Sequence, residues 1–353
     1  MEEGAFHILL GINSSPFKIM ISEYIIKQTV KRIKEKEIKA LMCGFIYVLI
    51  IRKNHLIEKL RYTIARMGNR MTTYYKIIIN DSLMYIDFRD NGISKELYVN
   101  KKREPFSTDF MKKIIREDDI VIDIGANIGY YVLLEAQLIG KGRVYAIEPI
   151  PTNRTLLEKN IELNLYKNVC VFNYAIGDRI GKGKMYIYNK GNWCSFIKNP
   201  NETVIEEKNF PIITLDSFIK EHLYQSPTFI RMDVEGYECQ IIRGMPKLLE
   251  EKKPLVIFME LHPPWLNLMS ESNTEEIIDT LKRNGFKVKA IFLEPVPPCN
   301  NKDIILLNKL RKIMGLPEFG LIGESYGELY KLLDEDLQCI PMVFFERYKE
   351  GNL

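Results

Sequence analysis

Alternation of apolar and polar residues first becomes regular at Tyr74. The stretch YYKIIINDSLMYIDF alternates on both sides of Asn80 and Asp81, a pair that favours a tight turn. It therefore predicts a β-hairpin over residues 74–88. The preceding residues, 1–70, have a helical pattern and no recognisable chemistry, so we expect an N-terminal helical extension.

From Asp119 onward, short apolar runs alternate with longer amphipathic segments. The predicted strands are 120–124 (IVIDI), 143–148 (RVYAIE), 169–175 (VCVFNYA), 228–234 (TFIRMDV), 255–261 (LVIFMEL) and 341–348 (PMVFFERY), and the predicted helices are 127–139, 152–165 and 238–251. Residues 177–210 have no clear period and are expected to be irregular. This order indicates βαβ units, and thus an α/β domain with a mainly parallel sheet. We place the domain at 71–353, with a core at about 119–295.

Residues 40–51, ALMCGFIYVLII, form an apolar run that follows a lysine-rich stretch. The run is too short to span a bilayer, which takes about 20 residues. Two interpretations remain open. Residues 25–52 either form a solvated helix that leads into a core helix, or they form a basic and apolar hairpin that rests on a membrane surface.

Composition narrows the class of protein. Apolar residues make up 46% of the 353 residues and charged residues 27%, while the net charge is only +4, so no nucleic-acid partner is predicted. The six cysteines include no Cys-x-x-Cys pair, which favours a reducing compartment. The four histidines lie far apart and form no zinc motif, so no metal is predicted. The expected location is the cytoplasm, either free or peripherally at a membrane.

The stretch VIDIGANIGYYVLL combines a buried strand, a glycine turn and the start of a helix. Such a turn presents backbone N–H groups to a ligand, and Gly125 and Gly129 would leave room for one. Glu148 follows the next strand, where its carboxylate could accept hydrogen bonds from ribose hydroxyls. Asp123 stands where a dinucleotide-binding loop has its first glycine, and its charge would repel a pyrophosphate. S-adenosylmethionine has a ribose and two cationic groups but no phosphate, so it fits better than a nicotinamide cofactor. A turn without a ligand, with Asp123 as a helix cap, is the alternative.

Several motifs together resemble one family. VIDIGANIGYY, VYAIEP, NYAIGD, TLDSF, RMDVEGYECQIIRGM and FMELHP occur in the order and spacing of the FkbM family of S-adenosylmethionine-dependent methyltransferases. The resemblance covers residues 74–261 and continues more weakly to the C-terminus. It implies a class I methyltransferase fold, which is Rossmann-like and doubly wound, with a mainly parallel seven-stranded sheet whose last strand is antiparallel.

The resemblance also implies a cofactor site and an activity. By position, Asp123, Gly125, Asn127 and Gly129 would line the methionine and ribose part of S-adenosylmethionine, Glu148 would bind the ribose hydroxyls, and Ala175 would lie beside the adenine. The expected activity is O-methylation of a hydroxyl on a sugar, glycan or glycolipid. Two alternatives stay open: a non-catalytic cofactor-binding or scaffold protein with the same fold, and an N-methyltransferase, whose Asn-Pro-Pro-Tyr signature the sequence HPPW echoes.

Polar residues at two predicted strand ends are candidates for the acceptor side. Asp233 and Glu235 follow one strand, and Glu260 and His262 end the next. A sugar hydroxyl is a weak nucleophile that gains from a nearby base. We expect His262 to be that base because its ordinary pKa is close to neutral, with Asp233 and Glu235 as further catalytic residues. Asp233 and Glu235 could instead bind a metal or only organise the loop.

Overall fold

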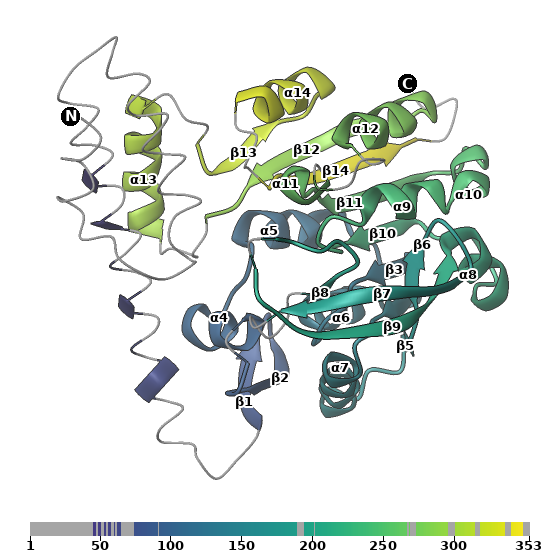
Figure 1. Ribbon diagram of the computed structural model, residues 1–353, viewed down its shortest axis with the longest axis horizontal. Coiled ribbons are helices and arrows are strands. Elements are labelled where there is room, and N and C mark those ends of the chain that lie inside the picture. Colours follow the sequence, from purple (N-terminus) through teal and green to yellow (C-terminus); the bar gives the residue numbers. More distant parts are fainter. Residues whose placement is uncertain are drawn as a thin grey trace.

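A computed structural model describes most of the chain beyond residue 73 (Figure 1). The described residues are 74–90, 92–188, 194–200, 202–266, 268, 273–295, 301–314, 318–335 and 340–348, with isolated positions between 45 and 64. Residues 25–44 of the predicted membrane hairpin therefore lie outside the described residues. Within the described part, no helix combines the length and the apolar character needed to cross a membrane.

The predicted hairpin is present. Strands β1 (Tyr74–Ile79) and β2 (Ser82–Asp87) pair antiparallel, with Ile79 opposite Ser82. The two turn residues, Asn80 and Asp81, have φ angles of 47° and 64°. Both are left-handed, which a two-residue hairpin turn of type I′ requires and which asparagine and aspartate tolerate better than most residues.

The central sheet confirms the predicted fold class. Its order is β13-β12-β14-β11-β10-β3-β4-β5, and β14 runs antiparallel to both of its neighbours, β11 and β12. The bounds are β3 (Ile120–Ile124), β4 (Arg143–Ile147), β5 (Val169–Phe172), β10 (Phe229–Met232), β11 (Leu255–Glu260), β12 (Lys287–Leu293), β13 (Gly320–Gly323) and β14 (Met342–Arg347). The expectation of seven strands is wrong by one, because β13 extends the edge beyond β12.

Helices cover both faces of this sheet. Alternate residues of β3 point to opposite sides: Ile122 packs in one apolar core and Val121 in the other. The Val121 side is covered by α4 (Ile93–Asn100), α5 (Pro105–Ile114), α6 (Tyr130–Leu138) and α7 (Pro151–Leu163). The Ile122 side is covered by α8 (Leu215–His222), α9 (Glu238–Arg243), α10 (Pro246–Glu250), α11 (Pro263–Leu266), α12 (Thr274–Arg283) and α14 (Tyr326–Glu335). Helix α13 (Asn301–Met314) follows β12 and is drawn to the left of β13 in Figure 1.

A second sheet contradicts the expectation that residues 177–210 are irregular. Strands β6 (Ala175–Gly177), β7 (Gly181–Tyr188), β8 (Cys194–Ser195) and β9 (Val204–Thr214) form a sheet with the order β6-β9-β7-β8. Much of β7 and β9 is exposed, and Lys184 of β7 forms an ion pair with Glu207 of β9 across the sheet. A strand exposed in this way lacks the apolar alternation by which strands are found in a sequence.

Two further predicted elements are divided in the structure. The expected strand 169–175 ends at Phe172, and Ala175 begins β6 in the other sheet. The expected helix 238–251 is broken into α9 and α10 at Gly244 and Met245, directly before Pro246. A side chain at Gly244 would meet the carbonyl oxygen of Gly177 at 2.0 Å, so the break also lets α9 approach the small sheet closely.

Candidate active site

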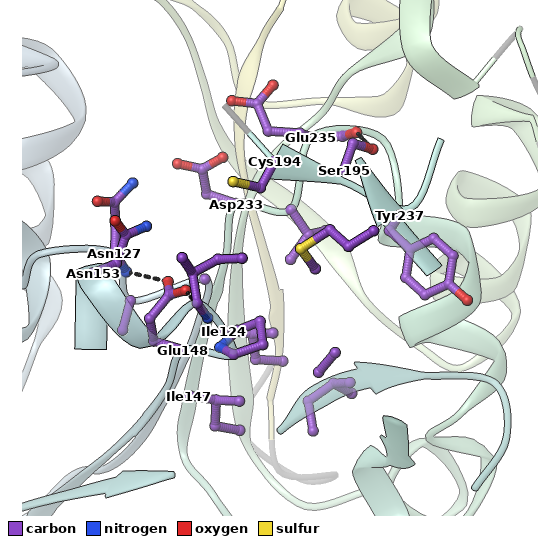
Figure 2. A pocket seen from close by; sticks show the side chains of 18 of the residues that line it. Ile124, Asn127, Ile147, Glu148, Asn153, Cys194, Ser195, Asp233, Glu235 and Tyr237 are labelled. Carbon is purple, nitrogen blue, oxygen red and sulfur yellow. Dashed lines mark hydrogen bonds between the residues drawn. The ribbon is translucent and has the colours of Figure 1, made fainter. Parts of the chain in front are cut away.

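A cavity lies at the carboxyl ends of the central strands, bordered by the small sheet (Figure 2). The cavity and the open solvent at its mouth together make up about 900 Å³. Its lining includes Gly125 and Asn127 after β3, Glu148 after β4, and Asp233 and Glu235 after β10. This is the edge at which α/β sheets bind ligands. The structure therefore brings the predicted cofactor turn and part of the predicted acceptor site to one cavity.

The two glycines of the turn are required by contacts inside the protein. Gly125 has a φ of +84°, and a Cβ atom there would lie 2.0 Å from the carbonyl oxygen of Asp233. Gly129 has a φ of +97°, and its Cβ would lie 2.7 Å from Leu157. We expected these glycines to leave room for a ligand. Instead they allow close packing and left-handed backbone, and Gly129 is not part of the cavity lining.

Glu148 is the clearest polar group on the cofactor side of the cavity. Its carboxylate accepts hydrogen bonds from the backbone N–H groups of Asn127 and Ile150, both at 2.8 Å. Burial raises the pKa of Glu148 to about 7, although these two bonds act in the opposite direction. Two oxygens have about four acceptor sites, so the carboxylate can still accept hydrogen bonds from a ligand. Ala175 lines the same cavity beside Ile147 and Met185, an apolar setting suited to an adenine ring.

Asp123 is placed differently from the other predicted cofactor residues. Its side chain is fully buried, it is not part of the cavity lining, and it forms a 3.0 Å ion pair with Arg231 of β10. Burial raises the pKa of Asp123, and Arg231 counteracts this. The cation that balances this carboxylate is thus supplied by the protein itself.

Arg231 was not predicted to be a site residue, although its position two residues before Asp233 could have indicated it. Its guanidinium group also binds Oδ2 of Asp233 at 3.0 Å and stacks on the Tyr131 ring at 4.3 Å. Arg231 and Asp233 are two residues apart in a strand, so alternation places them on the same side. Arg231 therefore joins β3, β10 and α6, and it is itself part of the cavity lining.

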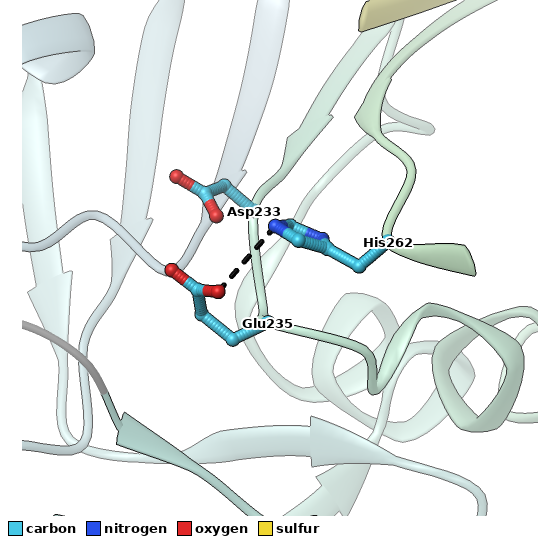
Figure 3. Close-up of side chains that lie close together, drawn as sticks. All are labelled: Asp233, Glu235 and His262. Atoms are coloured by element: carbon cyan, nitrogen blue, oxygen red, sulfur yellow. Dashed lines mark ion pairs between the residues drawn. The ribbon is translucent and has the colours of Figure 1, made fainter. Parts of the chain in front are cut away.

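The three predicted catalytic residues lie together at the ends of β10 and β11 (Figure 3). One potential ligand atom from each of Asp233, Glu235 and His262 lies within 4.8 Å of the other two. Asp233 and Glu235 line the cavity, while His262 lies behind them. Glu235 has a φ of +51°, and Ser195 of β8 donates a hydrogen bond to its carbonyl oxygen at 2.8 Å. The small sheet therefore helps to fix the loop that carries Glu235.

His262 is surrounded by carboxylates. Its Nδ1 lies 2.7 Å from Glu238, and its Nε2 lies 3.5 Å from Glu235 and 3.7 Å from Glu260. Burial alone would lower the pKa of His262, but these three carboxylates raise it well above its usual value. Without a bound cation these carboxylates favour the protonated ring, whereas the base that we expected from the sequence needs a neutral one.

Nothing in the sequence indicated that two further residues, Glu238 and Arg103, belong to the site. Glu238 is the first residue of α9 and is fully buried, and its partner His262 is 24 positions away. Arg103 precedes α5 and lines the cavity, with its guanidinium 3.8 Å from both Asp233 and Glu260. Only the folded chain brings such distant positions together. Trp193, whose indole ring could stack on a sugar, lies outside the described residues.

Parts of the chain are similar to known methyltransferases. Residues 123–288 match the family described as the methyltransferase FkbM domain. A hexuronic acid methyltransferase, AglP of Haloferax volcanii, is 24% identical over 180 residues, which are 48% of this chain and 68% of that protein. Methyltransferase 1 of Beauveria bassiana is 22% identical over 173 residues, 43% of this chain and 66% of the relative, just under two thirds.

Solved structures give a more distant likeness. The M. jannaschii TYW2 structure in complex with AdoMet has a TM-score of 0.38 and 16% identity, and the alignment covers 78% of this chain and 85% of that one. A putative rRNA methylase from Clostridium thermocellum has a TM-score of 0.38 and 14% identity, with 71% and 98% covered.

Proposed function

Because this chain belongs to the FkbM methyltransferase family through residues 123–288 and uses S-adenosylmethionine, we propose that it O-methylates a hydroxyl group of a sugar, glycan or glycolipid. The observation that carries the proposal is a single cavity lined both by Glu148, beside the glycine turn, and by Asp233 and Glu235. The carboxylate of Glu148 suits the ribose of the cofactor. The carboxylates of Asp233 and Glu235 suit an acceptor hydroxyl that has to lose its proton.

The cofactor would be held by the residues around the glycine turn. Glu148 would accept hydrogen bonds from the ribose hydroxyls, Gly125 and Asn127 would border the ribose and methionine part, and Ala175 would lie beside the adenine. When bound, S-adenosylmethionine supplies an electrophilic methyl group: an acceptor oxygen forms the new O–CH₃ bond as the S–CH₃ bond breaks to leave a neutral thioether, and the hydroxyl proton departs. Asp123 would not contact the cofactor directly. It would contribute by holding Arg231 in place through their ion pair.

The acceptor hydroxyl would be bound at Asp233 and Glu235. Their carboxylates can accept its hydrogen bond, orient its oxygen and receive its proton. His262 would hold Glu235 in place from behind, because its Nε2 faces that carboxylate. Arg103, at 3.8 Å from Asp233, and Arg231, at 3.0 Å, are cations that line this part of the cavity.

A sugar acceptor is supported by one relative, the hexuronic acid methyltransferase. N-methylation is less well supported. In an Asn-Pro-Pro-Tyr site the first residue accepts hydrogen bonds from the substrate's amino group. In the sequence HPPW that residue is His262, whose ring lies outside the cavity lining and whose Nδ1 is held by Glu238 at 2.7 Å.

Calorimetry separates this proposal from its rivals. The full chain is titrated with S-adenosylhomocysteine and, in parallel, with NAD. We expect saturable binding of S-adenosylhomocysteine and none of NAD. Binding of NAD alone would indicate an oxidoreductase and contradict the proposal. A non-catalytic protein would bind S-adenosylhomocysteine but transfer no methyl group, so a turnover assay distinguishes that case.

Replacing Glu148 by alanine should weaken binding of S-adenosylhomocysteine about 10- to 100-fold. A charged acceptor that receives two hydrogen bonds contributes roughly 1.5–3 kcal/mol. Since the pKa of Glu148 is about 7 in the free protein, affinity should also rise several-fold from pH 6 to pH 8, because only the ionised carboxylate accepts both bonds fully. Calorimetry across this pH range measures both effects.

Glu158→Ala is the matched control. Glu158 is a half-exposed glutamate in α7, the helix that follows Glu148 in the chain. It should leave affinity and its pH profile unchanged. A Glu148→Gln variant should lose the pH dependence and keep its thermal stability. Unchanged affinity in Glu148→Ala would mean that the ribose is held elsewhere.

We also propose that the N-terminal extension contacts a membrane. Among the described positions between 45 and 64, the side chains of Phe45, Leu49, Leu56, Leu60 and Ile64 are exposed, and their sequence spacing of four and seven residues is that of an amphipathic helix. Flotation with anionic vesicles should show binding that weakens with salt, and a Leu56→Glu, Leu60→Glu double variant should lose it. Equal recovery of both proteins in the unbound fraction would favour a solvated helix.

A further inference from the structure

We propose that Asp233, Glu235 and His262 bind a divalent metal ion that holds the acceptor oxygen. The inference rests on the proposed function for its role, but the site itself is argued from the structure. The three side chains come from the carboxyl ends of two neighbouring parallel strands, β10 and β11, and face one another (Figure 3). One oxygen or nitrogen atom from each lies within 4.8 Å of the other two, a spacing that a single ion can bridge.

The orientation of His262 is the first observation that points to an ion. Its side chain is 1% exposed, and Nδ1 is held at 2.7 Å by Glu238, itself fully buried. Nε2 therefore points into the carboxylate cluster. Its distances of 3.5 and 3.7 Å to Glu235 and Glu260 exceed an ordinary N–H···O hydrogen bond, and no other hydrogen bond reaches it from the described residues. A histidine that binds a metal is commonly fixed in this way, by a carboxylate on its other nitrogen.

The charge balance is the second observation. Around the cluster, carboxylates outnumber the guanidinium groups of Arg103 and Arg231 and the imidazole of His262; they belong to Glu104, Asp123, Asp233, Glu235, Glu238 and Glu260. Among the described residues, one buried oxygen of Glu238 and one of Glu260 have no hydrogen-bond partner. Buried carboxylates in excess are costly unless they are protonated or balanced by a cation. A divalent ion would supply that balance.

The donor set indicates which ions fit. Two carboxylates and one imidazole form an oxygen-rich set, which suits Mn²⁺ or Mg²⁺ and leaves further positions for water or substrate. Because Asp233 and Glu235 line the cavity, an ion between them would face the acceptor. It would orient the hydroxyl and lower the pKa of that group, so that the proton leaves more readily.

Mn²⁺ is the best probe, because its free form has a strong electron paramagnetic resonance signal that binding suppresses. The full chain is freed of metal with a chelator and titrated with Mn²⁺. We expect one saturable site per chain, competed by Mg²⁺. Glu235→Gln should weaken Mn²⁺ binding at least 10-fold. Glu250→Gln, a change at an exposed glutamate at the end of α10, should leave it unchanged.

The same samples are then titrated with S-adenosylhomocysteine. Absence of saturable Mn²⁺ binding, or binding that Glu235→Gln and Asp233→Asn leave unaltered, would overturn the metal site while cofactor binding keeps the proposed function intact. Loss of S-adenosylhomocysteine binding in the wild-type chain would instead overturn the proposed function. Thermal unfolding of each variant verifies that the altered chain is folded.

Discussion

Replacing Glu235 by glutamine should lower methyl transfer by about 10²- to 10⁴-fold, with at most a few-fold change in affinity for S-adenosylhomocysteine. Glutamine keeps the size of the side chain but cannot accept a proton or balance a cation. A positioned group that takes a proton from the nucleophile contributes about this much to the rate. Glu235 lines the cavity directly, so its loss should act on turnover and not on the fold.

The measurement is turnover at saturating S-adenosylmethionine, with calorimetry for the cofactor. Glu206→Gln, in the exposed part of β9, serves as the control and should keep wild-type turnover. Asp233→Asn should also reduce turnover, but with some loss of stability, because Asp233 is paired with Arg231. Near-normal turnover in Glu235→Gln would remove this residue from the reaction and leave Asp233 or His262 as the remaining candidates.

Arg231→Met should reduce the free energy of unfolding by about 3–5 kcal/mol. The methionine replaces most of the apolar stem, but Asp123, which is fully buried, loses its only ion-pair partner among the described residues. An uncompensated buried charge costs about this much. The change also removes the contact with the Tyr131 ring, so α6 should loosen against β10. Urea unfolding followed by circular dichroism gives the difference.

Arg89→Met is the matched control. Arg89 pairs with Asp87 at 2.6 Å, but its side chain is 69% exposed, and removing an exposed ion pair changes stability by about 1 kcal/mol or less. Adding Asp123→Asn to Arg231→Met should restore part of the lost stability, because it removes the unpaired charge. If Arg231→Met is as stable as Arg89→Met, the buried pair is not what joins β3 to β10.

The central sheet was predictable because its strands are buried on both faces. Segments such as 120–124 and 255–261 are nearly continuous apolar runs, and no other element of comparable length would bury them. The small sheet was missed for the opposite reason: β7 and β9 are largely exposed and polar, and they are held together by backbone pairing that the sequence does not display. The division of the helix at Gly244 could have been expected from Pro246.

The site was predictable only in part. Strand ends indicated Asp233, Glu235, His262 and Glu148, because parallel strands present their carboxyl ends at one edge of a sheet. The sequence could not show that Arg231 neutralises Asp123, since that pair is 108 residues apart. Nor could it show that Glu238 turns His262 toward a carboxylate cluster. The proposed metal site has no sequence motif, because its ligands, Asp233, Glu235 and His262, follow two separate strands and include only one histidine.

The central claim, methyl transfer to a carbohydrate hydroxyl, is tested most directly by locating the transferred methyl group. The full chain is incubated with S-adenosylmethionine carrying a trideuterated methyl group and with glycan and lipid extracts, and the products are hydrolysed to monosaccharides for mass spectrometry. We predict a sugar that carries one deuterated methyl group on oxygen, formed by the wild-type chain and reduced at least 100-fold with Glu235→Gln. A deuterated methyl group on nitrogen, or in products without a sugar, would contradict the account.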